Sequence, residues 1–138
     1  MTTTRLVTSG LFADGLRLLR LSLRLDAVVT GANGLAYLAL AGPLEDLLGL
    51  NAGAGRAIGA FLLVYAVAVW LISMPARPHR LAALAVVEAN VLWTVLSIVT
   101  LIAGWLSLDS IGIVWTVMQA LVVAGFAGVQ YVALRRIR

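Results

Sequence analysis

The stretch SLRLDAVVTGANGLAYLALAG, residues 22–42, reads as a membrane-spanning helix that carries a strip of polar side chains. Four polar residues follow one another at positions i, i+4, i+7 and i+11: Asp26, Thr30, Asn33 and Tyr37. At about 100° of rotation per residue, this spacing keeps the four side chains on one narrow face of a helix. A polar strip on an apolar helix in lipid must face other helices or an internal cavity. The stretch therefore predicts a helix whose polar face is turned toward the protein interior.

The composition agrees with a membrane protein. Of the 138 residues, 62% are hydrophobic, and the mean hydropathy is +1.05. Soluble domains are only about 45–50% apolar, so we expect the bilayer to be the solvent of this single-domain chain. The sequence has no cysteine and one histidine, His79, which excludes disulfides, thiolate metal sites and a bis-histidine haem within one chain. We therefore predict no metal and no cofactor, and no segment has a nucleic-acid-binding motif.

Four runs have the roughly 20 apolar residues that a hydrocarbon core of about 30 Å requires. They cover about residues 22–42, 56–74, 81–104 and 111–134. The Gly42-Pro43 pair is expected to end the first run. The leucine-rich connector 43–55 predicts a short interfacial helix or a re-entrant cap. The predicted fold class is all-α, an integral membrane four-helix bundle that forms one domain over residues 1–138.

A basic amphipathic segment, residues 10–25, precedes the first run. Arg17, Arg20 and Arg24 fall at i, i+3 and i+7 on one face of a helix, and leucines cover the rest. This pattern is typical of a segment that lies at the lipid headgroups before the chain enters the membrane. The segment either binds anionic lipid or a partner, or only orients the first span. Residues 1–9 are small and polar and predict a loose end, so that residues 1–21 form a cytoplasmic arm.

The arginines predict the topology. With the N-terminus inside, nine of the ten lie on the cytoplasmic side: Arg5, Arg17, Arg20, Arg24, Arg77, Arg80, Arg135, Arg136 and Arg138. The outer connectors hold Glu45, Asp46 and Asp109, with only Arg56 at a span end. Because cytoplasmic loops carry the excess of positive charge, both termini are expected inside. We predict a multi-pass protein of the cytoplasmic (inner) membrane of a bacterium.

Polar residues also lie within the later runs. Depth along the helices places Asp26, Glu88 and Gln130 in the cytoplasmic half, and Asn33, Asn90 and Gln119 nearer the midplane. Two further polar faces follow from the spacing: Asn90, Trp93 and Ser97 on the third run, and Trp115, Gln119 and Gln130 on the fourth. Glu88 lies about 200° from Asn90 around the helix, so the two cannot both point to one centre. The second run carries mainly Tyr65 and is expected to face lipid or a second copy of the chain.

An ionised carboxylate at membrane depth costs about 2.5–3.5 kcal/mol. Asp26 and Glu88 therefore require either a nearby arginine, Arg24 or Arg80, or a proton. Two interpretations stay open for these polar groups: a proton- or cation-linked site, or hydrogen bonds that hold the helices together. Small-residue pairs predict close helix contacts and a possible homodimer: Ala27 with Gly31, Gly55 with Gly59, and Ala124 with Gly128.

Two families share features with the chain. The run GPLEDLLGLNAGAGRAIG, residues 42–59, with AFLLVYAVAVW after it, resembles DoxX-like small bacterial membrane proteins. That resemblance implies a four-helix bundle, sometimes associated with membrane oxidoreductases, and assigns no catalytic residue. Asp26 and Trp93 look superficially similar to features of the small multidrug resistance transporters, which have a similar size and an acidic residue in span one. The long basic N-terminal arm and the absence of the surrounding motif count against that family.

Three functions are compatible with these patterns. The first is a non-enzymatic membrane protein that binds a small lipophilic ligand or serves as an accessory subunit of a larger membrane complex. The second is a dimeric proton-coupled transporter that uses Asp26 or Glu88. The third is a lipid-modifying membrane enzyme with these two carboxyls as an acid/base pair, which requires both to face one cavity about 5–9 Å apart.

Overall fold

The structure, a computed structural model, describes residues 2–105 and 107–137, and within them all side chains except those of residues 2–9, 11 and 12. The described residues form five helices and no strand. The helices are α1 (Thr2–Ala39), α2 (Ala41–Leu48), α3 (Ala52–Ser73), α4 (Arg80–Ala103) and α5 (Ser110–Arg136). The all-α prediction is confirmed, and α3, α4 and α5 begin and end within about four residues of the predicted runs.

Three to four of these helices suit a membrane span. Helices α3, α4 and α5 are each long and apolar enough to cross a bilayer. Helix α1 meets the same test only together with α2, which follows it at a bend of 93°. A multi-pass membrane protein is therefore confirmed by helix length and composition.

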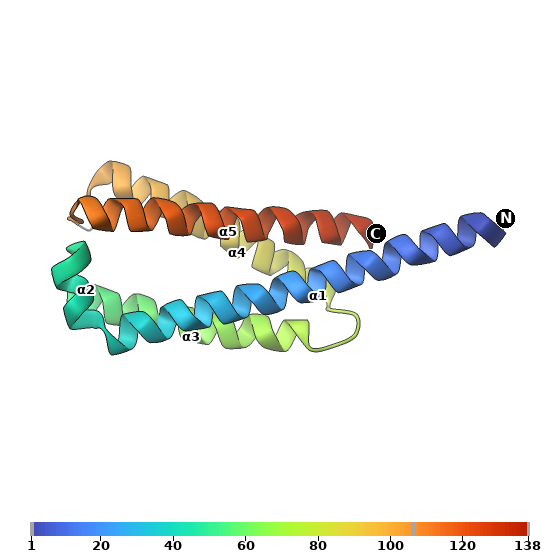
Figure 1. Ribbon diagram of the computed structural model, residues 1–138, viewed down its shortest axis with the longest axis horizontal. Helices are drawn as coiled ribbons and strands as arrows, with labels where there is room; N and C mark the ends of the chain where they lie inside the picture. Colours follow the sequence, from blue (N-terminus) through green and yellow to red (C-terminus); the bar gives the residue numbers. More distant parts are fainter. Residues whose placement is uncertain (1, 106, 138) are drawn as a thin grey trace.

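Helix α1 differs from the prediction at its N-terminal end. Its 38 residues form one unbroken helix, about 57 Å long at 1.5 Å per residue. The predicted loose end and the predicted amphipathic segment are both part of this helix, which extends past the end of α5 (Figure 1). The reason is that leucine and arginine are strong helix formers and no proline precedes Pro43. No break therefore separates the predicted headgroup segment from the first span, and its position at the headgroups stays a prediction.

The helix ends follow local chemistry. Pro43 has no backbone N–H and lies in the first turn of α2, where that N–H would have no partner within the helix. Proline therefore suits the start of α2 and not the continuation of α1, which ends at Ala39. Gly49 and Gly104 end α2 and α4 in the left-handed conformation, at φ 75° and 69°. Helices α3, α4 and α5 each begin after a capping residue whose side chain accepts a hydrogen bond from the backbone N–H three residues later. The capping residues are Asn51, His79 and Asp109, in that order.

The helices pack in two contacting pairs, α1 with α3 and α4 with α5, and α1 joins the pairs by also packing on α5. Helices α3 and α4 contact each other only a little. Both termini and the α3–α4 loop lie at one end of the molecule, and α2 lies at the other (Figure 1).

Helices α1 and α3 approach each other closely at Gly34 of α1 and Gly59 of α3. A Cβ on Gly59 would lie 2.8 Å from the carbonyl oxygen of Gly34, and a Cβ on Gly34 would lie 2.9 Å from that of Gly59. Only glycine permits this approach. Helix α3 therefore packs closely on α1, which differs from the prediction that the second run mainly faces lipid or a second copy.

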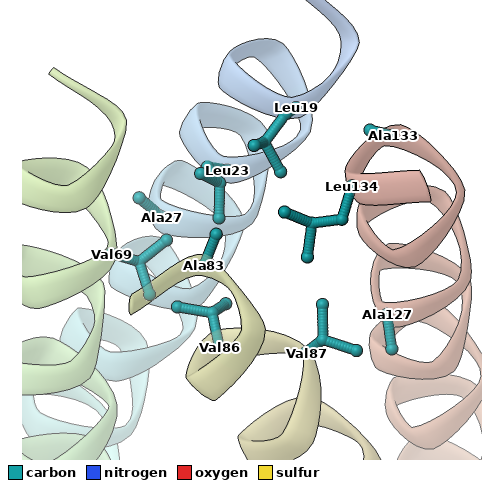
Figure 2. Close-up of a cluster of buried hydrophobic side chains, with 10 residues drawn as sticks. All are labelled: Leu19, Leu23, Ala27, Val69, Ala83, Val86, Val87, Ala127, Ala133 and Leu134. Atoms are coloured by element: carbon teal, nitrogen blue, oxygen red, sulfur yellow. The ribbon is translucent and has the colours of Figure 1, made fainter. Parts of the chain in front are cut away.

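A buried apolar cluster closes the end of the molecule that holds the termini (Figure 2). Leu19 and Leu23 of α1 are fully buried and point toward Leu134 of α5 and Val69 of α3. These two leucines belong to the segment predicted to lie among lipid headgroups. Because lipid is also apolar, their burial stabilises mainly through close packing, and it fixes this part of α1 against the other helices.

Candidate functional site

A cavity of about 480 Å³ lies between α1, α3, α4 and α5. Its volume is within the range of about 300–1,000 Å³ that small-molecule sites occupy. Most lining residues are apolar; the polar ones are Asp26, Thr30, Asn33, Tyr65, Asn90 and Gln119. Phe61, Leu92 and Met118 line the cavity and are also about half exposed. A ligand could therefore enter sideways from the bilayer.

Asp26, Asn90 and Gln130 form the polar centre beside this cavity. They are 2%, 3% and 0% exposed and come from α1, α4 and α5. Asp26 Oδ2 accepts hydrogen bonds from Asn90 Nδ2 at 2.8 Å and from Gln130 Nε2 at 2.9 Å. Asn90 Nδ2 also donates to Gln130 Oε1 at 3.1 Å. Three helices are thus joined through one carboxyl oxygen and two amides.

Thr30 and Tyr65 extend this network. Thr30 lies one helical turn after Asp26, and its hydroxyl donates to Asp26 Oδ1 at 3.0 Å. The Tyr65 hydroxyl of α3 donates to Asn90 Oδ1 at 2.9 Å. All four long helices therefore contribute a side chain, and we call these five residues the Asp26 network: Asp26, Thr30, Tyr65, Asn90 and Gln130.

Neither predicted arginine partner contacts Asp26. The Arg24 guanidinium lies 5.6 Å above the Trp70 ring, and its Nε is buried without a hydrogen-bond partner among the described residues. Arg80 donates to the Leu134 carbonyl oxygen at 3.2 Å. The carboxyl is instead satisfied by the amides and the hydroxyl of the network.

Aromatic rings form one wall of the cavity. Phe61 is stacked on Trp93, with ring centroids 5.8 Å apart and an angle of 6° between the planes. It is also stacked on Tyr65 at 6.1 Å and 17°. Trp115 and Phe126 of α5 line the same cavity. This wall offers flat apolar surface within the same space as the Asp26 carboxyl.

Asn33 and Gln119 also line the cavity, on α1 and α5. Both are partly exposed, and neither side chain has a hydrogen-bond partner among the described residues. Their amides can each donate to and accept from a bound molecule.

A second cavity of about 300 Å³ lies nearer α2. Trp93 and Trp115 line both cavities, so they stand between them. Trp115 Nε1 donates to the Tyr37 hydroxyl at 2.9 Å. Ser97 also lines the second cavity, and its hydroxyl donates to the Trp93 carbonyl oxygen. Tyr37 and Ser97 thus belong to this second space, although the predicted strip and faces joined them to Asp26 and Asn90.

Glu88 lies apart from both cavities. It is exposed on α4, whereas Asn90, two residues later, is buried. The predicted angle of about 200° between the two is the reason, since the inward Asn90 turns Glu88 outward. Among the described residues no three acidic or histidine side chains gather where they could hold a metal ion.

The three predicted headgroup arginines have different environments. Arg17 is exposed. Arg20 donates to the carbonyl oxygens of Ser73 and Met74 at 3.3 Å each, which satisfies backbone acceptors at the end of α3. Arg24 stacks on Trp70, as described above. Arg20 and Arg24 thus hold α1 to α3.

Tyr65 and Phe61 of α3 are among the cavity-lining residues that the sequence patterns did not assign to a site. Both lie on α3, a helix with no polar strip that would mark an inward face. The available signal was that Tyr65 is the only side chain with a hydrogen-bonding group within the apolar run AFLLVYAVAV, residues 60–69. A buried tyrosine hydroxyl requires a partner, and Asn90 provides it.

The fold and the site define a class: an all-helical protein with three to four helices long and apolar enough to span a membrane, and a largely apolar cavity beside a buried carboxyl. Comparison of the chain with family models, with curated proteins and with solved structures finds no match. The DoxX-like resemblance, the homodimer and the membership of a larger complex therefore stay predictions.

Proposed function

We propose that this chain is a non-enzymatic integral membrane protein that binds a small lipophilic ligand in the cavity between α1, α3, α4 and α5. The observation that carries the proposal is the cavity itself. It is of small-molecule size and its walls are mainly apolar and aromatic. Two amides without hydrogen-bond partners among the described residues, those of Asn33 and Gln119, are available to orient a ligand.

Packing in the surrounding helices supports the same proposal. Well-packed interiors contain few voids larger than a water molecule. The Asp26 network and the buried cluster around Leu19 and Leu23 hold the four helices together at one end. The cavity between the four helices stays open because α3 and α4 contact each other only a little. A preformed space of this kind lowers the cost of binding.

The two alternative functions make different demands on the site. An acid/base enzyme needs Asp26 and Glu88 on one cavity, whereas Asp26 lines the larger cavity and Glu88 is exposed outside it. Proton-coupled transport stays a prediction, and of its two candidate residues Asp26 is the one beside the cavity.

Quenching of tryptophan fluorescence tests the proposal. Trp93 and Trp115 line the cavity, so 1-bromoadamantane bound there should quench their emission saturably in the detergent-solubilised chain. Ala89→Phe places a ring in the cavity and is expected to weaken this binding by about 10-fold or more. Ala85→Phe is the matched control, because Ala85 lies one turn earlier on α4, is exposed and does not line the cavity. Identical quenching curves for the unaltered chain and both variants would show partition into detergent and refute the proposal.

A further inference from the structure

The hydrogen bonds of Asp26 leave one acceptor position open. An ionised carboxylate offers about four such positions, two on each oxygen. Oδ2 accepts from the amides of Asn90 and Gln130, and Oδ1 accepts from the Thr30 hydroxyl. The remaining position on Oδ1 has no donor among the described residues. Because Asp26 lines the cavity, a bound molecule can supply that donor.

The donors around Asp26 require that Oδ2 carries no proton. An amide N–H can donate but cannot accept, so both bonds to Oδ2 need an oxygen without a proton. No described arginine contacts the carboxylate: Arg24 stacks on Trp70, and Arg80 bonds to a carbonyl oxygen of α5. The buried carboxyl therefore lacks a cationic partner within the described chain, and Oδ1 is the oxygen at which a proton or a bound cation can meet it. A bound cation would supply the partner that an ionised carboxyl at membrane depth requires.

The wall beside Asp26 also favours an organic cation over a metal ion. Phe61 and Trp93 present stacked rings, and the faces of aromatic rings attract cations. Asp26 is the one carboxyl among the lining residues, and most of the remaining lining is apolar. A metal ion would need several oxygen ligands, whereas an organic cation can place its charge at Asp26 and its apolar body along the rings.

We propose that the ligand of this cavity is an amphiphilic amine whose protonated nitrogen donates a hydrogen bond to the open position on Asp26 Oδ1. This inference rests on the proposed function and adds the chemical class of the ligand. A primary, secondary or tertiary ammonium group has the N–H that the open position requires, and a quaternary ammonium group does not. A neutral alcohol has a donor and no charge.

Three probes with one apolar body separate these properties: 1-adamantylamine, 1-adamantyltrimethylammonium and 1-adamantanol. Their affinities for the full detergent-solubilised chain are measured by isothermal titration calorimetry, with Ala89→Phe as the reference for a filled cavity. The amine is expected to bind about 10- to 100-fold more tightly than the other two, since a charge-assisted hydrogen bond distinguishes it. In Asp26→Asn the amine should lose this advantage, while the alcohol changes by less than about threefold. Asp46→Asn, an exposed carboxyl on α2, is the matched control and should leave all three affinities unchanged.

The possible outcomes separate the two proposals. If the alcohol binds as tightly as the amine and Ala89→Phe abolishes both, the cavity binds lipophiles but the amine inference is wrong. If the quaternary probe equals the amine, the N–H donor to Oδ1 is refuted. If Ala89→Phe changes none of the affinities, the proposed function itself fails. The comparison of the three probes on the unaltered chain decides the inference even where Asp26→Asn does not fold.

Discussion

At the scale of single residues, Asn90 is the centre of the Asp26 network. Its amide donates to Asp26 and to Gln130, and its carbonyl oxygen accepts from Tyr65. One side chain of α4 thus bonds to side chains of α1, α3 and α5. Hydrogen bonds between membrane helices each contribute about 0.6 kcal/mol on average, so a residue that makes three of them has more effect than most.

We predict that Asn90→Leu destabilises the folded chain by about 1–3 kcal/mol, because it removes the three buried hydrogen bonds that Asn90 makes with Asp26, Gln130 and Tyr65. The matched control is Asn33→Leu. Asn33 also lies within a long helix, α1, but its side chain has no hydrogen-bond partner among the described residues. Unfolding in a titration with sodium dodecyl sulfate, followed by circular dichroism, measures both. Equal losses for the two variants would contradict the assigned role of Asn90.

At the scale of the elements, the pairing of α1 with α3 decides which side chains reach the cavity. The contact of Gly34 with Gly59 brings the two helices together, and α3 then presents Phe61 and Tyr65 to the site. The sequence predicted close contacts from small-residue pairs that include Gly59. It did not predict Gly34 as the partner, because spacing within one helix does not show which residue of another helix lies opposite.

Gly59→Ala is expected to destabilise the chain by about 1–3 kcal/mol, since the added Cβ overlaps the Gly34 carbonyl oxygen and the Tyr37 side chain. Gly125→Ala on α5 serves as the comparison, because its Cβ would meet nothing within 4 Å. It should be neutral or stabilising by up to about 1 kcal/mol, the helix-propensity gain of alanine over glycine. Thermal unfolding in detergent measures the pair. A loss of stability in Gly125→Ala as large as that in Gly59→Ala would refute close packing at Gly34 as the cause.

At the scale of the whole molecule, the apolar surface faces outward and the polar groups gather inside. Val64, Ile102 and Leu121 are 72%, 83% and 69% exposed, whereas Asp26, Asn90 and Gln130 are buried. A soluble protein has the opposite arrangement. The ends of the molecule differ as well: the termini and the α3–α4 loop lie at one end, and α2 lies at the other (Figure 1).

The predicted orientation can be tested because the chain has no cysteine. Ala76→Cys places one thiol in the α3–α4 loop, and Asp46→Cys places one on α2; both positions are exposed. From the arginine distribution we predict that a membrane-impermeant maleimide labels Asp46→Cys in intact cells and Ala76→Cys only in inverted membrane vesicles. Labelling of Ala76→Cys in intact cells would reverse the predicted topology.

The sequence alone determined the helical class, the approximate bounds of the three later helices and the presence of Asp26, Asn90 and Gln130 as polar residues within apolar helices. It could do so because a chain in lipid must satisfy its backbone hydrogen bonds within helices, and because helical periodicity fixes which residues share a face. Only the tertiary structure decided which faces meet. It made α1 continuous through Leu19 and Leu23, turned Glu88 outward and brought Tyr65 to Asn90. The rotation of one helix against another depends on side-chain packing across the interface, and that information is not contained in the spacing along any single helix.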